Sequence, residues 1–312
     1  MKISLHSVSY SGFFYRGDPL SIEDMIRKLS EIGYDGLELM AKRPHANPMD
    51  LDEKARKEIR ELADSHNIEL ANLAAYNDFS GPDSFKRELN LLYIHEVIKL
   101  ARDLGIKTVR VFAAGMGAVD QNVSYWKHWE LCREGLIEAA KWAEDYGVTL
   151  ALQNHPPVMD SFKDVLDMID EVGRESLKAC IDPELLVRSG DINPFSERLH
   201  DDLLEIYSKF KDLLVFIHVG DSTIKSKRAV WLPGGGGVFA AQKVEREVLG
   251  QGTFGKIAES FVKVLKQIGY DGFLSYEICS PRYVKHALVS FETVDAEVRD
   301  GLKYLKQLIS KV

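Results

Sequence analysis

The sequence predicts an α/β protein, a single (β/α)8 TIM-barrel domain that spans residues 1–312. Short apolar or β-branched segments alternate with amphipathic, charged segments from one end of the chain to the other, which is typical of repeated βα units. The chain of 312 residues is 45% hydrophobic and 28% charged, so it can bury a large core without division into two domains. No glycine-rich dinucleotide-binding motif follows the first strand, which disfavours an open doubly wound sheet.

Eight strands are expected, in the order KISLHSV (2–8), GLELMA (36–41), IELANLAAY (68–76), TVRVFAA (108–114), TLALQNH (149–155), KACIDPEL (178–185), LVFIHVGD (214–221) and GFLSYEIC (272–279). Helical patterns lie between them. In SIEDMIRKLSEIG, Ser21 and Asp24 have the spacing of a capping box and Gly33 is a stop signal. A similar helical pattern followed by glycine occurs in FGKIAESFVKVLKQIGYDG. The segment Ile-Gly-Tyr-Asp-Gly occurs at both 32–36 and 268–272. In such a barrel the active site lies at the C-terminal strand ends.

Composition disfavours several classes of partner. The net charge of −8 and the pI near 5.7 argue against nucleic acid, because phosphate binding relies on clustered Lys and Arg. No run of about 18 apolar residues is present, so we expect no membrane segment and a cytoplasmic location. Three cysteines without close spacing suit a reducing compartment, and we expect Cys132, Cys180 and Cys279 to be buried small side chains.

The connection between the seventh and eighth strands is unusually long. It contains a glycine run at 234–237 and the basic residues Lys227 and Arg228. Long loops on the catalytic face of a barrel are often lids or binding loops, so residues 222–250 are expected either to order over a ligand or to form a solvated excursion. A phosphate group on the substrate would favour substrate contacts for Lys227 and Arg228.

Polar side chains end four consecutive predicted strands. They are Gln153 with His155, Asp182 with Glu184, His218, and Glu277. Carboxylates that converge at a barrel mouth repel one another and resist burial, and a divalent metal resolves that conflict. Oxygen ligands from Asp182, Glu277 and Gln153 with the imidazole of His218 suit Mn²⁺, Mg²⁺, Co²⁺ or Zn²⁺, in a catalytic rather than a closed structural site.

These residues and their surroundings resemble a known family over nearly the whole chain. The matching pieces are GYDGLEL, ALQNHP, CIDPELL, FIHVGDS, GQGTFG and GYDGFLSYEIC. The chain is similar to the sugar phosphate isomerase/epimerase superfamily of xylose isomerase-like TIM barrels. The resemblance implies that Gln153, Asp182, His218 and Glu277 occupy its four metal-ligand positions, and that the protein forms a homo-oligomer, a dimer or a tetramer.

The resemblance also raises a question about the mechanism. In the ketose epimerases of this superfamily the first ligand is usually a glutamate, and both glutamates act as acid/base groups. Gln153 can bind a cation through its carbonyl oxygen, but it cannot accept and return a proton at neutral pH. The metal remains an expectation, whereas a mechanism with two carboxylate bases is in doubt.

The chemistry expected of such a site is enolisation of a sugar, keto sugar, polyol or sugar phosphate through an enediolate. Glu277 is the expected base, and His155 is either a second acid/base group or a structural histidine. Further substrate contacts are expected from Glu38, Arg110, Trp126 and Glu184.

Three outcomes stay open on the same site: isomerisation, epimerisation, and elimination by a lyase or dehydratase of a keto sugar or inosose. A non-catalytic sugar-binding subunit is a further alternative. The apurinic-site endonucleases of the same superfamily need a richer histidine and carboxylate cluster and a basic surface, and the sequence has neither.

Overall fold

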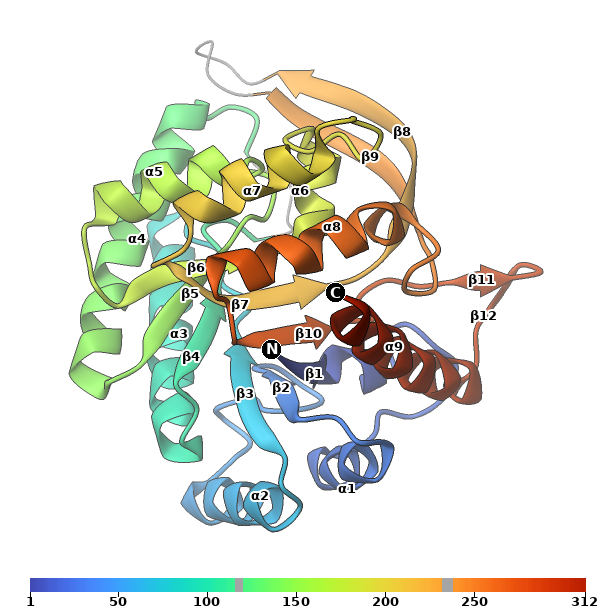
Figure 1. Ribbon diagram of the computed structural model, residues 1–312. Coiled ribbons are helices and arrows are strands. Elements are labelled where there is room, and N and C mark those ends of the chain that lie inside the picture. The colour runs from blue at the N-terminus through green and yellow to red at the C-terminus, as the bar shows by residue number, and fades with distance from the viewer. Residues whose placement is uncertain (116–119, 232–237) are drawn as a thin grey trace.

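Eight parallel strands close into a barrel in the computed structural model, with helices around its outside (Figure 1). The structure describes residues 1–115, 120–231 and 238–312, and the side chains of these except in 226–231 and 238–243. The barrel strands are β1 (Lys2–His6), β2 (Gly36–Met40), β3 (Glu69–Ala74), β4 (Thr108–Val111), β5 (Thr149–Gln153), β6 (Leu177–Ile181), β7 (Leu214–Val219) and β10 (Phe273–Tyr276). All eight predicted strands are present, and the predicted (β/α)8 fold is confirmed.

Helices follow the strands as the sequence pattern predicts. They are α1 (Ile22–Ile32), α2 (Glu53–Ser65), α3 (Ser84–Leu104), α4 (Tyr125–Tyr146), α5 (Phe162–Val172), α6 (Pro183–Ser189), α7 (Leu199–Lys209), α8 (Thr253–Ile268) and α9 (Phe291–Lys311), with a 3₁₀ turn η1 (Ser7–Tyr10) after β1. The Ser21 hydroxyl accepts the Asp24 N–H and so caps α1. Serine and aspartate side chains cap the next four helices in the same way.

The repeated Ile-Gly-Tyr-Asp-Gly segment makes the same helix-to-strand turn twice. Gly33 and Gly269 end α1 and α8 in the left-handed conformation, with φ of 95° and 78°. The strands that follow, β2 and β10, both pair with β1. The two copies therefore flank the first strand of the barrel.

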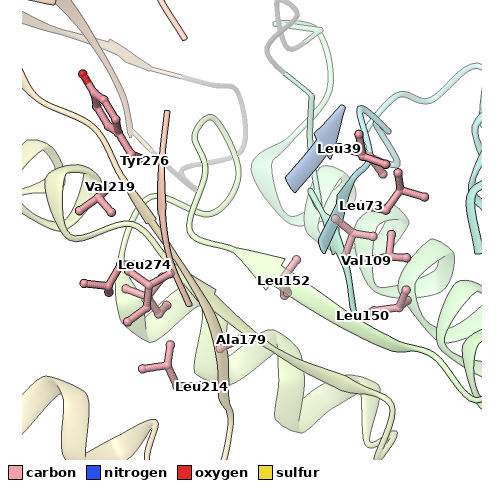
Figure 2. Packing of buried hydrophobic residues seen from close by; sticks show 14 of the residues in the cluster. Leu39, Leu73, Val109, Leu150, Leu152, Ala179, Leu214, Val219, Leu274 and Tyr276 are labelled. Atoms are coloured by element: carbon pink, nitrogen blue, oxygen red, sulfur yellow. The ribbon is translucent and has the colours of Figure 1, made fainter. Parts of the chain in front are cut away.

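Alternation along the strands separates an apolar outer face from an inner face that carries both polar and apolar side chains. Leu39, Leu73, Val109, Leu150 and Leu274 are fully buried members of the main core cluster, which also includes the buried faces of the helices (Figure 2). The residues one position away along the same strands have the opposite orientation. Four of these inner residues, Ala151, Cys180, Phe216 and Phe273, form a small separate apolar cluster.

The sixth predicted strand was drawn too long. β6 ends at Ile181, and α6 begins at Pro183, whose ring fits the first position of a helix. Asp182 is the N-cap of this helix rather than a strand residue, and Glu184 lies in its first turn. The prediction extended the strand because the apolar run continues through Pro183, and a proline is compatible both with a bend in a strand and with the first turn of a helix.

The long connection after β7 is a hairpin over most of its length, and not the loop that was expected. β8 (Ser222–Trp231) and β9 (Val238–Arg246) pair antiparallel and form the curved ribbon at the upper right of Figure 1. The glycine run at 234–237 lies outside the described residues, and so do the side chains of Lys227 and Arg228. A second short hairpin, β11 (Tyr283–Val284) with β12 (Ala287–Leu288), precedes α9.

The expectation for the cysteines is correct in part. All three are free, and Cys132 and Cys180 are buried, but Cys279 is exposed. It lies three residues past the end of the buried strand β10. Within the described residues, none of the helices is long and apolar enough to cross a membrane.

Candidate active site at the barrel mouth

Three of the four expected metal ligands face one another near the C-terminal strand ends. Gln153 is the last residue of β5, His218 lies in β7, and Glu277 follows β10 directly. The Nδ1 atom of His218 lies 3.3 Å from the Gln153 amide nitrogen and 3.4 Å from Oε2 of Glu277. Gln153 and His218 are buried, whereas the Glu277 side chain is 12% exposed.

Asp182 is held beside this group by its role as a helix cap. Its Oδ1 accepts the backbone N–H groups of Glu184 and Leu185 at 2.8 and 3.3 Å. Its own N–H donates to Oδ1 of Asn154, and the Asn154 amide donates back to the Asp182 carbonyl. Burial, and after it the carboxylates of Glu184 and Glu277, raise the pKa of Asp182 well above its usual range. Negative charge is therefore crowded here.

The buried carboxylate of Glu38 orients the His218 ring. Its Nε2–H donates to Oε1 of Glu38 at 2.8 Å, and the Glu38 side chain is fully buried. Asn72 donates to the same oxygen at 2.8 Å, and Ser275 donates to Oε2 at 2.6 Å. Burial alone would raise the pKa of Glu38, but the His218 and His6 imidazoles hold it well below its usual range. Against its own burial, the same carboxylate and Glu277 raise the pKa of His218.

Glu184 already has protein partners. Its Oε1 accepts a hydrogen bond from the Ser222 hydroxyl and lies 3.8 Å from Nη1 of Arg188, one turn later in α6. Burial raises the pKa of Glu184. The structure thus brings this residue near the expected ligand group, with its carboxylate shared between β8 and α6.

Arg110 points into the barrel from β4 and is 2% exposed. Its Nη1 donates to the Ala75 carbonyl at 2.8 Å, and its Nε has no hydrogen-bond partner among the described residues. The guanidinium carbon lies 3.9 Å from the ring centre of Phe112 and 5.2 Å from that of Tyr76. Lys42, which follows β2, places its Nζ 3.6 Å from the same Tyr76 ring.

His155 lies two residues beyond β5 and is half-buried. Its Nδ1–H donates to the Pro156 carbonyl at 2.6 Å, and its ring centre is 4.3 Å from that of Phe112. Burial, followed by the charge of Arg110, lowers the pKa of His155 to about 4. The imidazole is therefore neutral at pH 7, with Nε2 as its acceptor nitrogen. Trp126, at the start of α4, is 62% exposed and packs its ring edge-on against Tyr125.

The donor set fits a divalent cation in its chemistry. Two carboxylates, an imidazole nitrogen and an amide are the ligands that such ions take in catalytic sites, and a cation would relieve the crowding that raises the pKa of Asp182. The Nε2 bond to Glu38 leaves Nδ1 of His218 for a metal, which is the usual carboxylate–histidine arrangement behind a ligand. As the side chains stand, no group of three or more His, Cys, Asp or Glu residues within the described ranges is placed to hold a metal ion.

Comparison with known families agrees with the barrel fold. Residues 26–308 match the model of the xylose isomerase-like TIM barrel family. The chain belongs to this family. A curated relative from Escherichia coli O157:H7, named fructoselysine 3-epimerase, is 27% identical over 291 residues, which cover 88% of this chain and 94% of that protein. A protein of the same name from Shigella flexneri is 27% identical over 246 residues, 76% of this chain and 83% of the relative.

Solved structures share the fold of this xylose isomerase-like barrel. The D-psicose 3-epimerase of Clostridium cellulolyticum H10, in a complex with D-tagatose, superposes with a TM-score of 0.67 at 16% identity over 99% of both chains. A 3-keto-D-glucoside 4-epimerase from E. coli gives 0.68 at 17% identity, over 98% of this chain and 99% of the other.

Several residues of the site were not predicted from the sequence. Asn154 ties β5 to Asp182, Asn72 and Ser275 hold Glu38, and Lys42 stands beside Tyr76. Strand parity could have found Asn72 and Ser275, since each occupies an inward position on a predicted strand. Lys42 lies past the end of its strand, where parity no longer applies.

Proposed function

We propose that this protein is a metal-dependent isomerase or epimerase that acts on a keto sugar, a sugar or a sugar phosphate through an enediolate. The observation that carries the proposal is the convergence of Gln153, Glu277 and His218 Nδ1, with Glu38 on the other side of the imidazole. The curated relatives support the sugar class, because both are named for epimerisation of fructoselysine at carbon 3.

The residues that would hold the cation are Gln153, Asp182, His218 and Glu277. A half-turn of the Gln153 amide presents its carbonyl oxygen, the atom that binds hard cations. A divalent ion, Mn²⁺, Zn²⁺, Mg²⁺ or Co²⁺, supplies positive charge that stabilises developing negative charge on the substrate oxygens. Glu38 keeps the His218 ring in place and its Nε2 protonated.

Glu277 is the group to which we assign the proton transfer. It is the most exposed of the inferred ligands and a carboxylate, so it can take a proton from the carbon next to a carbonyl and return it to the product. His155 is a weaker base at pH 7, because its pKa is about 4. Its Nε2, the acceptor nitrogen of the neutral ring, suits it to accept a hydrogen bond from a substrate hydroxyl instead.

One observation supports elimination as a second candidate reaction. Gln153 has no basicity, and His155 has little at neutral pH, so the inferred site has one strong base rather than two. A single base is enough for isomerisation or for the loss of water from a keto sugar or inosose. Epimerisation needs proton return on the opposite face of the carbon, by a group other than Gln153.

Metal content and proton exchange test the proposal together. Protein stripped with chelator and then incubated with each of the four ions is expected to retain about one ion per chain by elemental analysis. In D₂O, NMR should show deuterium entering the α-carbon of a ketohexose, and mass spectrometry separates epimers from a dehydrated product. Absence of bound metal and of exchange across a panel of keto sugars and inososes would overturn the proposal and favour a non-catalytic sugar-binding subunit.

A further inference from the structure

Two cationic side chains stand together at the mouth without a carboxylate partner. The Nζ atom of Lys42 and the guanidinium carbon of Arg110 lie 3.6 and 5.2 Å from the centre of the Tyr76 ring. No Asp or Glu oxygen among the described residues lies within 4.0 Å of either cation. The residues and side chains outside the described set, 116–119 and 226–243, include no Asp or Glu, so they supply no carboxylate either.

The position of these cations mirrors that of the carboxylates. The closed strand order places β2 and β4 directly across the barrel from β6 and β10. Lys42 and Arg110 come from the first pair of strands, whereas Asp182 and Glu277 follow the second. We call the side of β2 and β4 the cationic half and the side of β6 and β10 the anionic half; the buried Glu38 carboxylate of β2 lies on the cationic half but is paired with His218.

The two cations of the cationic half have no ion-pair partner within 4.0 Å among the described residues. Burial, and after it the charge of Arg110, lower the pKa of Lys42, so each cation makes the other less stable. Lys42 contacts the Tyr76 ring and Arg110 contacts the Phe112 ring, and each ring face stabilises the positive charge. Such contacts provide no hydrogen-bond acceptor for the N–H groups. In the part of the chain that the structure describes, the Nε of Arg110 is buried without a hydrogen-bond partner. A guanidinium edge with free N–H groups is the usual donor for carboxylates and phosphates.

We propose that Lys42 and Arg110 bind an anionic group of the substrate, a phosphate monoester or a carboxylate, at the end remote from the carbon that loses its proton. This inference rests on the proposed function for the placing of the reacting carbon beside Glu277. A sugar that spans the mouth brings its anion to the cations while its carbonyl end lies against the opposite half. The preferred substrate is then an anionic keto sugar rather than a neutral one.

The test compares matched sugars on the metal-loaded protein. D-Fructose, D-fructose 6-phosphate and a hexuluronate supply the neutral, phosphate and carboxylate members, with binding measured by calorimetry and exchange by NMR. An anionic member should bind about 10- to 100-fold more tightly than the neutral sugar, as expected for charge-assisted hydrogen bonds. The anionic sugar that binds more tightly identifies the anionic group, phosphate or carboxylate, that the site accepts.

Variants then assign the preference to its residues. Lys42→Met should reduce the ratio of anionic to neutral affinity about tenfold, and Arg110→Lys should reduce it while retaining the charge, because the planar donor edge is lost. Lys263→Met, at an exposed position on α8, is the matched control and should leave the ratio unchanged. Lys42 is half-buried at the mouth, so its variant remains informative if changes at the buried Arg110 impair folding.

The outcomes separate the two proposals. Equal affinity for neutral and anionic sugars in the wild-type protein overturns the anion site, even where proton exchange is observed. Tight anion binding that depends on Lys42, without exchange in any sugar, leaves the anion site standing and removes the proposed reaction. Anion preference that survives both variants also overturns the assignment.

Discussion

Replacing Glu38 with Gln should destabilise the metal-free protein and weaken its hold on metal. The carboxylate is fully buried and makes hydrogen bonds with His218 at 2.8 Å, Asn72 at 2.8 Å and Ser275 at 2.6 Å. Glutamine keeps the shape but removes the charge, so an imidazolium at His218 would be buried without its partner. Removal of one member of a buried ion pair costs about 3–5 kcal/mol of unfolding free energy.

The pH dependence gives this prediction its sign. Glu38 raises the pKa of His218, so the pair stabilises the fold fully below the unfolded histidine pKa of about 6.5 and loses that contribution as pH rises through the folded value. The pKa of Glu38 is depressed, so its own contribution is present above an unfolded value of about 4.3 and is lost as pH falls through the folded one. The Glu38→Gln penalty should therefore be largest near pH 6 and smaller near pH 9.

Urea unfolding with chelator present, followed by circular dichroism at both pH values, measures the penalty. Ser275→Ala is the matched control, because it removes one hydrogen bond to the same carboxylate and leaves the charge, at a cost of about 1.5–3 kcal/mol without the fall toward pH 9. Metal titration of Glu38→Gln should show about 10- to 100-fold weaker binding. An equal penalty at pH 6 and pH 9, or one smaller than that of Ser275→Ala, would refute the pairing of Glu38 with an imidazolium.

Two further predictions concern the base and a second buried histidine. Glu277→Gln should abolish exchange of the α-proton in NMR while metal still binds, whereas Gln153→Glu should keep or tighten metal binding; full exchange in Glu277→Gln would transfer attention to His155. His45 donates from Nε2 to the Leu20 carbonyl and accepts from the Ser7 hydroxyl at Nδ1, and burial lowers its pKa to about 4. As pH falls from about 6.5 to about 4, the histidine is protonated in the unfolded chain but not in the folded one, so the free energy of unfolding decreases by about 3 kcal/mol. Urea unfolding of His45→Gln should therefore show a smaller loss of stability at acidic pH. An unchanged pH profile would contradict this prediction.

Local signals were enough to predict the barrel. The cap of α1 at Ser21 and the repeated turns at Gly33 and Gly269 depend on residues that are neighbours in the sequence. Eight βα units of this kind can be arranged in only a few ways, of which the closed barrel is one. The hairpin β8–β9 was missed because its basic and glycine-rich centre suggested a loop. The end of β6 was misplaced because Pro183 begins a helix whose cap, Asp182, is also the expected ligand.

The partners of the site residues could not be predicted in the same way. Glu38 and His218 are 180 residues apart, and nothing near either residue identifies the other. Their contact is a product of barrel closure, which turns inward positions on distant strands toward a common axis. Arg110 could be placed inside the barrel by its strand position, but its stacking on Phe112 and its nearness to Lys42 depend on rotamers and on a segment beyond the strand.

Barrel closure also explains why this mouth is poised for ligands. The inner cluster of Phe216 and Phe273 and the burial of the polar residues deprive the charges of water, so each must be compensated by another charge. Among the described residues, the Glu38–His218 pair at 2.8 Å is compensated within the protein, and Arg188 lies 3.8 Å from Glu184. Asp182 on one half and Lys42 on the other respond with pKa values shifted toward their neutral forms. A cation beside Asp182 and an anion beside Lys42 would each favour the ionised form of that residue. Binding of either ligand should therefore stabilise the folded state to which the other ligand binds.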